Sequence, residues 1–224
     1  YGCSDPLVEN YNIDANYDDG SCEYPDNGNY ALNFDGSNDY VQINNNGIVS
    51  NSGDFTNDFT ISLSFKNYES FQNDGNNLIS FGDAFTSNKR LSVYIDLQNN
   101  IRIVMQDNDW TTAYNVADNV WTRLSLTYTN NTLRLYIDGL FVDETDQYVV
   151  SIDDTRAFII GKNTENKESE YYTGEIERVS IWDIAKSPEQ IQDEMNIELS
   201  GNDQSLVGYW KFNEGEGNIL YDHS

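Results

Sequence analysis

The sequence predicts an all-β fold: a two-sheet antiparallel β-sandwich, or jelly roll, with one short helix near the C-terminus. Two observations predict it. A dozen short apolar or alternating stretches are separated by Asn, Asp and Gly turn signals, and no helical crossovers divide them, as parallel strands would require. With 224 residues, 38% of them apolar, the chain can bury one sizeable core and a small appendage.

Turn signals place the expected strands between residues 31 and 212. Asp-Gly pairs at 35–36 and 138–139 and Asn-Asn pairs at 99–100 and 130–131 are typical of tight turns, and the first pair predicts a hairpin. The expected strands are residues 31–34, 40–43, 59–65, 78–81, 91–97, 101–105, 121–128, 132–137, 140–142, 158–160, 174–182 and 206–212.

The stretch YYTGEIERVSIWDIAKSPEQIQ, residues 171–192, predicts a strand that leads into the helix. Strict alternation would place Glu175, Glu177 and Val179 on one side of the strand, and the residues between them on the other. Ser187 and Gln190 then form a capping box around a proline at the first helical position.

Composition excludes several classes of partner. The chain has 38 acidic and 12 basic side chains, a formal net charge of -26, which repels phosphate backbones and anionic lipid headgroups. We expect no nucleic-acid partner. No apolar run approaches the roughly 18 residues of a membrane span, so membrane insertion is not expected either. Such a charge suits a salty extracellular setting, and with no leader before Tyr1 the chain is expected to be a mature segment.

The two cysteines, Cys3 and Cys22, bracket an Asn/Asp-rich loop with few apolar side chains. A disulfide between them would stabilise such a small module by about 3 kcal/mol. Two free thiols remain the alternative. We expect residues 1–25 to form this module and residues 26–224 to form the sandwich.

Inside the loop, oxygen-bearing side chains follow the D-x-N-x-D spacing that suits calcium. They are Asp14, Asn16, Asp18 and Asp19. The match to an EF-hand is imperfect, and Asn/Asp/Gly turns also form without metal. The segment GCSDPLVENYNIDANYDDGSCEY resembles short modules that recur in secreted proteins of marine bacteria, which implies a secreted or cell-surface location.

Five motifs in order carry a wider resemblance: ALNFDGSNDYVQI, FTISLSF, VWTRLSLTYTNNTLRLYIDGLFV, IIGKN…YYTGEIERVSIWDIAKSPEQI and LVGYWKFNEGEG. Residues 30–212 are thus similar to the laminin-G-like, concanavalin-type jelly roll, with pentraxin-like features. The resemblance implies a secreted binding or adhesion domain, often specific for carbohydrate and often assisted by Ca²⁺.

The resemblance also implies candidate calcium ligands in two loops. After the IIG strand, Asn163 and Glu165 begin an oxygen-rich loop, but lysines nearby and a missing aspartate near residues 87–88 argue against the paired calcium site of pentraxins. A single structural ion would involve residues of the 35–39 turn. They are Asp35, Asn38 and Asp39.

Jelly rolls of this type also include retaining glucanases, which use two carboxyl groups about 5 to 5.5 Å apart. Glu175 and Glu177 invite the comparison, but the third acidic position is Val179 or Ser180, and His223 is the single histidine. We therefore expect no enzyme activity.

Sugar-binding modules use flat aromatic rings beside acids and amides. The loop 106–114 combines both, and residues 171–172 follow the acidic loop after the IIG strand. The candidate ligand-binding residues are Trp110, Tyr114, Asp107, Asp109, Tyr171 and Tyr172. Trp121 and Trp182 are assigned to packing, since they lie in strands.

Two functions remain open. The first is a non-catalytic module that binds a polysaccharide or cell-surface glycan with calcium assistance, within a larger extracellular protein. The second is an adhesion or spacer module that contacts other protein modules and carries structural calcium without glycan specificity.

Overall fold

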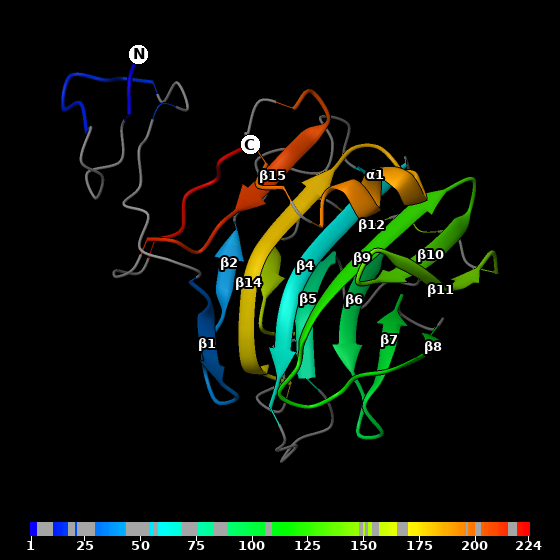
Figure 1. Ribbon diagram of the computed structural model, residues 1–224. Helices are drawn as coiled ribbons and strands as arrows, with labels where there is room; N and C mark the ends of the chain where they lie inside the picture. The colour runs from blue at the N-terminus through cyan, green and yellow to red at the C-terminus, as the bar shows by residue number, and fades with distance from the viewer. Residues whose placement is uncertain are drawn as a thin grey trace.

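Antiparallel strands of two sheets make up the computed structural model (Figure 1). The structure describes residues 1–3, 11–17, 21, 30–43, 54–55, 58–68, 76–82, 89–105, 109–147, 150, 152–153, 157–164, 170–195, 197–199, 203–214 and 219–224, with the backbone alone for 54–55 and 152–153. The expected two-sheet antiparallel sandwich is confirmed.

One sheet has seven strands in the order β1-β14-β4-β9-β10-β11, with β15 also paired to β14. The bounds of these strands are β1 Leu32–Asp35, β4 Phe59–Asn67, β9 Trp121–Thr129, β10 Thr132–Ile137, β11 Leu140–Thr145, β14 Thr173–Trp182 and β15 Leu206–Trp210.

The other sheet has six strands in the order β2-β13-β5-β6-β7-β8, and β3 pairs with β12 in a small ladder. Their bounds are β2 Val41–Ile43, β3 Asp54–Phe55, β5 Asn76–Gly82, β6 Arg90–Ile95, β7 Asn100–Val104, β8 Asp109–Asn115, β12 Ile152–Asp153 and β13 Phe158–Ile160.

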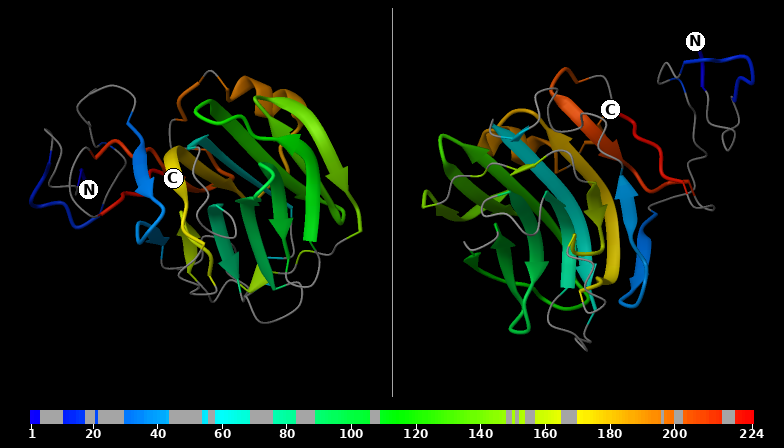
Figure 2. Two further views of the ribbon diagram at one scale, coloured as in Figure 1. Left: turned by 90° about the horizontal axis from the view of Figure 1, so that it is seen from below. Right: turned by 180° about the vertical axis from the view of Figure 1, so that it is seen from behind.

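The core lies between the two sheets, which face one another in all the views (Figure 2). Alternate residues of each strand point into it, because successive side chains leave a strand on opposite faces. On β4 these are Phe59, Ile61, Leu63 and Phe65, all 0% exposed. The side chains between them lie on the outer face of the seven-stranded sheet, and it is this outer face that carries the candidate site.

Most turns form where the sequence predicts them. Asn99, Asn130, Asn131 and Asp138 all have positive φ, between 48° and 62°. Asn and Asp tolerate this left-handed backbone better than other residues with a Cβ atom. The hairpins β6–β7, β9–β10 and β10–β11 follow.

The hairpin predicted around residues 35–39 is wrong. The strand β1 pairs with β14 in the seven-stranded sheet, whereas β2 pairs with β13 in the six-stranded sheet. The Asp-Gly turn therefore carries the chain from one sheet to the other.

The helix α1, Pro188–Asp193, begins as the sequence predicts. The Ser187 hydroxyl accepts a hydrogen bond from the Gln190 backbone N–H, and the Gln190 side chain accepts one from the Ser187 backbone N–H. Ile191 is the buried residue of the helix. In the described part of the chain no helix is long and apolar enough to span a membrane.

The described N-terminal residues form a turn beside Cys3, which is 1% exposed. The Cys3 carbonyl accepts a hydrogen bond from Asn12 N–H at 2.9 Å, and the Asn12 carbonyl accepts one from Ala15 N–H at 2.9 Å. None of the described cysteines is free, but Cys22 lies outside the described residues. The Cys3–Cys22 pair and the 1–25 module stay predictions.

Candidate functional site

An exposed tryptophan lies in a row of polar side chains on the outer face of the seven-stranded sheet. The register places Asn33 of β1 opposite Glu175 of β14, Glu175 opposite Lys66 of β4, and Lys66 opposite Trp121 of β9. These four residues, with Tyr68 just beyond β4, are called the Trp121 row. Trp121 is 41% exposed.

Polar contacts join the members of the Trp121 row. Lys66 Nζ lies 3.3 Å from Glu175 Oε2, 5.9 Å from the centre of the Trp121 ring and 5.5 Å from that of Tyr68. The Tyr68 hydroxyl donates to Glu175 Oε1, and Asn33 Nδ2 donates to the Tyr68 oxygen at 3.5 Å. The hydrogen bond to Glu175 is the main cause that raises the pKa of Tyr68. These contacts hold the carboxylate and the amide beside an open aromatic ring.

A bulge in β14 changes which residues share this face. Glu175 and Glu177 lie opposite Lys66 and Ser64, but the register then shifts, and Ser180 pairs with Ser62. Arg178, at the shift, has φ of +46°, which is unusual for a residue with a Cβ atom. Ser180 therefore lies on the same face as Glu175.

The alternation predicted for this strand is accordingly correct through Glu177 and wrong after it. Val179 is 0% exposed and belongs to the core together with Ile176, although strict alternation placed it with the two glutamates. The extra residue at the bulge reverses the order of inner and outer positions.

Arg123 of β9 lies two residues after Trp121, on the same face and opposite Ser64 of β4. It is 6% exposed. Burial, and then the positive charge of Arg178, lower the pKa of Arg123 to about 10. The outer face thus has an open aromatic row and, next to it, a buried guanidinium group.

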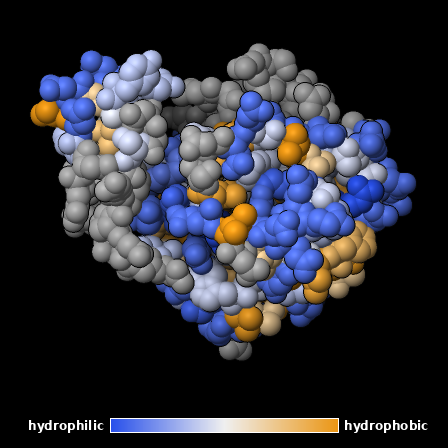
Figure 3. All heavy atoms as spheres, turned by 45° about the horizontal axis from the view of Figure 1, so that its top comes forward, coloured by the Kyte–Doolittle hydropathy of each residue, from blue (hydrophilic) through white to orange (hydrophobic). Residues whose placement is uncertain are grey.

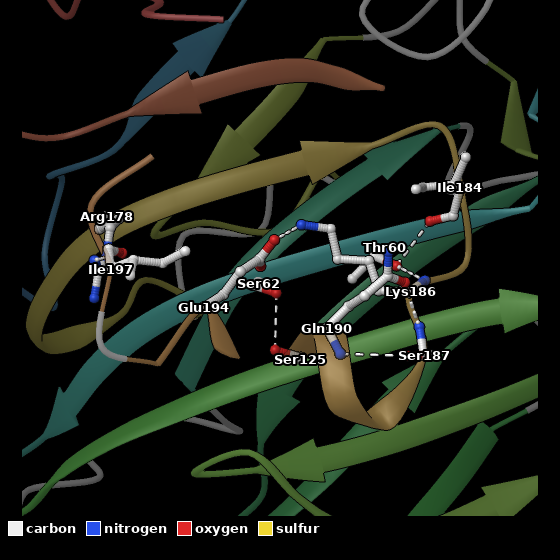
Figure 4. A network of polar contacts seen from close by, with 10 residues as sticks. All are labelled: Thr60, Ser62, Ser125, Arg178, Ile184, Lys186, Ser187, Gln190, Glu194 and Ile197. Carbon is white, nitrogen blue, oxygen red and sulfur yellow. Dashed lines mark hydrogen bonds and ion pairs between the residues drawn. The ribbon is translucent and has the colours of Figure 1, made fainter. Parts of the chain in front are cut away.

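Residues 183–195, called the covering segment, lie over the remaining part of this face (Figure 4). The Thr60 hydroxyl of β4 donates to the Ile184 carbonyl at 2.8 Å and accepts from Lys186 N–H at 2.9 Å. Beneath the segment, the Ser62 and Ser125 hydroxyls share a hydrogen bond of 2.8 Å. This part of the face is therefore closed by protein.

An ion pair inside the covering segment lies against the sheet. The ammonium group of Lys186 contacts the Glu194 carboxylate (Figure 4). The same group lies over the ring of Trp182. Burial, and to a lesser extent the positive charge of Arg123, lower the pKa of Lys186 to about 7, whereas the negative charge of Asp203 opposes this effect because it stabilises the charged form. Trp182 is 4% exposed, so its predicted role in packing is confirmed.

Comparison with protein families decides what kind of domain this is. The family model described as the concanavalin A-like lectin/glucanases superfamily (Laminin_G_3) matches residues 35–192. The chain belongs to this superfamily.

Solved structures share the superfamily fold at low sequence identity. A candidate carbohydrate-binding protein from Bacteroides ovatus is 19% identical with a TM-score of 0.67, and the match covers 86% of this chain and 54% of that protein. This chain thus spans about half the length of that protein. A pentraxin from Limulus polyphemus is 13% identical with a TM-score of 0.56, covering 71% of this chain and 78% of that one.

Domain 4 of an extracellular arabinanase from Geobacillus stearothermophilus, solved in complex with arabinotriose, is 16% identical with a TM-score of 0.55. The match covers 80% of this chain and 82% of that domain. A search of curated proteins gave no significant match.

The aromatic loop expected in this superfamily domain at residues 106–114 is partly a strand. Residues 109–115 form β8, and Trp110 points into the core with 8% exposure. Tyr114 is half-buried against the same core. Asp109 is exposed and forms an ion pair with Arg102 at 2.8 Å, while Asp107 lies outside the described residues. The loop prediction is wrong, because Trp110 and Thr112 supply an inner face that loop composition did not reveal.

The neighbouring tyrosines Tyr171 and Tyr172 have different environments. Tyr172 is 0% exposed and its ring meets Phe34 edge-on at 5.8 Å. Tyr171 is half-buried, 6.4 Å from the ring of Tyr40, and Lys162 Nζ lies 5.0 Å and 4.8 Å from the two ring centres. Only Tyr171 of this pair has ring surface available to a ligand.

The described calcium candidates bond mainly within their own turns. Asp39 Oδ2 accepts from Asp35 N–H at 3.0 Å, and Asp35 Oδ1 accepts from Ser37 N–H at 2.8 Å. Asn38 is exposed on the same turn. Asn163 is 4% exposed, and its amide donates to Glu170. Among the described residues of these turns, no further acids lie around a common centre.

In the N-terminal turn, Asp14 N–H donates to Asn12 Oδ1 at 3.0 Å, and Asn16 is exposed. Among the described residues no three acidic, histidine or cysteine side chains form a group that could hold a metal ion. Asp18, Asp19 and Glu165 lie outside the described residues. Calcium binding stays a prediction.

Sequence reasoning missed the Trp121 row. It assigned Trp121 to packing because the residue lies in a strand, but alternation shows only that a residue shares a face with its second neighbours. The row needs the register of β1, β14, β4 and β9, which joins residues up to 142 positions apart in pairs that no local pattern specifies. One signal was available in the sequence: Lys66 lies at the end of an alternating stretch and Glu175 near the start of another, so a charged residue stands at one end of each expected strand.

Proposed function

We propose that this domain is a non-catalytic carbohydrate-binding module of an extracellular protein, and that it stacks a sugar ring on Trp121. The observation that carries the proposal is the exposed Trp121 ring within a row of hydrogen-bonding side chains. Sugar rings present C–H faces that pack on aromatic rings, while hydroxyls bond to acids and amides. The Trp121 row supplies both kinds of contact.

The comparisons support this proposal at the level of the fold. Two of the similar structures are a candidate carbohydrate-binding protein and an arabinanase domain in complex with arabinotriose. In the view of Figure 3, polar residues cover most of the surface that the described residues form.

Catalysis is not part of the proposal. Both oxygens of Glu175 are engaged, one by Lys66 and the other by the Tyr68 hydroxyl. A retaining glycosidase needs one carboxylate free to attack the sugar and a second carboxyl group beside it, and the Glu175 carboxylate is already held by these two contacts. We expect no reducing ends to be released from β-glucans.

The binding site can be tested on a glycan array followed by calorimetry with the best ligand. Trp121→Ala should weaken binding at least tenfold, which corresponds to about 1.4 kcal/mol, and Trp121→Phe should restore part of it. Phe141→Ala is a matched control, since Phe141 is 54% exposed on β11 of the same sheet but lies outside the row.

Loss of binding in Trp121→Ala with an unchanged Phe141→Ala would support the proposal. Equal affinity in wild type and Trp121→Ala would move the site elsewhere, with Tyr40 and Tyr171 as the next surface to test. If the wild type binds no glycan on the array, either with or without calcium, the result would instead favour the adhesion or spacer function.

A further inference from the structure

Arg123 is a buried guanidinium group that has no acidic partner among the described residues, in a chain whose formal net charge is -26. In the described part of the chain, ion pairs involve Lys66, Arg102, Arg134, Lys186 and Lys211, but not Arg123. Its Nε and Nη1 atoms are buried and make no hydrogen bond. A buried unpaired charge is costly and is seldom retained without a role.

Asp138 and Glu177 lie near Arg123 but form no ion pair with its guanidinium group. The Asp138 carboxylate accepts the backbone N–H of Arg123 at 2.9 Å. Glu177 raises the pKa of Arg123 through its charge, but the effect is smaller than that of burial and of Arg178, which lower it. Among the charged neighbours of Arg123, the one with the largest effect on its pKa is therefore another positive group, Arg178.

Other unsatisfied donors lie on the same face. Arg178 Nε and Trp182 Nε1 are buried without a hydrogen-bond partner, as is the Ser180 hydroxyl. Arg178 Nη1 reaches only the Ile197 carbonyl, at 3.4 Å. The group is unusual because nearly all of its unsatisfied atoms are N–H donors, which an acceptor bearing negative charge would satisfy together.

We propose that Arg123 and Arg178 form an anion subsite next to Trp121, and that the sugar bound by this module carries a carboxylate or sulfate group. This inference rests on the proposed function. Trp121 and Arg123 lie two residues apart on one face of β9, about 7 Å along the strand. An anionic substituent of a sugar ring stacked on Trp121 would lie over this part of the strand, and it contacts the Arg123 guanidinium when the side chains that bury this group move aside on binding.

An anionic group would account for two unusual features of this face: the unpaired guanidinium group of Arg123 and the second positive charge near it. It would pair with the buried guanidinium, which offers parallel N–H donors that match a carboxylate or sulfate. It would also lie between two positive charges that otherwise repel one another. A neutral sugar would leave the charge of Arg123 unpaired, so the site should discriminate between acidic and neutral forms of the same saccharide.

The test compares three probes: an oligogalacturonate, its fully methyl-esterified neutral form, and a sulfated galactan oligosaccharide. We expect wild type to bind one of the two acidic probes at least tenfold more tightly than the neutral form, with an affinity that falls as salt rises. The preferred acidic probe identifies the substituent as carboxylate or sulfate.

Two arginine variants separate binding from folding. Arg123→Met should remove the preference for the acidic probe while leaving the melting temperature of the free protein unchanged or higher, because an unpaired buried charge is lost. Arg134→Met is the matched control: Arg134 lies on the neighbouring strand β10 and pairs with Glu144 at 2.9 Å. It should keep the preference for the acidic probe.

The outcomes distinguish the two proposals. Equal binding of acidic and neutral probes, both lost in Trp121→Ala, would overturn the anion subsite but leave the proposed function intact. A lower melting temperature in Arg123→Met with unchanged acidic preference would also overturn the subsite. Absence of binding to all saccharides would overturn both.

Discussion

Individual aromatic residues of this domain differ in role according to which face of a strand they occupy. Trp121 and Tyr172 both belong to strands or their ends, yet Trp121 is 41% exposed and Tyr172 is 0% exposed. The sequence predicted the reverse roles: Tyr172 as a ligand contact, because it follows an acidic loop, and Trp121 as packing, because it lies in a strand. The difference depends on tertiary contacts. Trp121 lies opposite Lys66 on the outer face of the sheet, whereas the ring of Tyr172 packs against that of Phe34.

Tyr172→Phe should raise stability slightly. The Tyr172 hydroxyl is buried without a hydrogen-bond partner, and removal of such a group recovers a desolvation cost of about 1 kcal/mol. Urea unfolding at pH 7 would measure the change, with Tyr171→Phe as the matched control. A loss of stability in Tyr172→Phe would show that the hydroxyl makes a favourable interaction.

The same variant should also change how stability depends on pH in alkaline solution. Burial raises the pKa of Tyr172 well above its ordinary value of 10.0, so above about pH 10 the unfolded chain releases this proton while the folded chain keeps it. The unfolded state then binds fewer protons, and stability falls as pH rises. We expect this loss between pH 10 and 11 to be smaller in Tyr172→Phe than in wild type.

At the scale of elements, the sequence predicted what local chemistry controls. Turn positions followed from residues that tolerate positive φ, such as Asn130 and Asp138, and the start of α1 followed from Ser187 and Gln190. Partner choice did not follow: β1 and β2 joined different sheets, and the bulge at Arg178 depends on pairing with β4. Pairing is set by contacts between distant segments, so the candidate site on these strands could not be assembled from local patterns.

The covering segment should depend on both members of its buried ion pair. Lys186→Met should destabilise the domain by about 3 kcal/mol, because it leaves the Glu194 carboxylate buried without its partner. The double variant Lys186→Met with Glu194→Leu should recover most of this loss, since two apolar side chains leave no buried charge. Chemical denaturation of the single and double variants would measure both effects.

The Lys211–Glu198 pair provides the control for that cycle. Its atoms lie 2.7 Å apart, but the Glu198 side chain is 69% exposed, and exposed pairs contribute about 0 to 1 kcal/mol. Lys211→Met should therefore change stability little. Equal losses at the two sites would mean that burial does not decide the strength of the Lys186–Glu194 pair.

At the scale of the whole molecule, a formal net charge of -26 is distributed over a single sandwich. The sequence predicted this architecture because alternation and turn signals are repeated along most of the chain. An error at a single strand therefore does not change the predicted fold class. The net charge also follows from the sequence alone, since it needs no tertiary information. Such a net charge opposes compaction through self-repulsion, and screening by salt reduces the cost.

Calcium should raise the melting temperature beyond the effect of salt alone. An ion that binds only the folded state stabilises it by RT ln(1 + [L]/Kd), about 2.7 kcal/mol at a concentration 100 times Kd. The test is a thermal melt in CaCl₂, in MgCl₂ and in EDTA, all at one ionic strength, so that screening is equal. A higher melting temperature in calcium than in magnesium would indicate a specific site.

Asp18→Asn and Glu165→Gln would then separate the N-terminal loop from the loop after β13, because only the variant that removes a ligand should lose the calcium effect. Identical melts in calcium and EDTA would contradict the prediction and leave these acids as solvated surface residues.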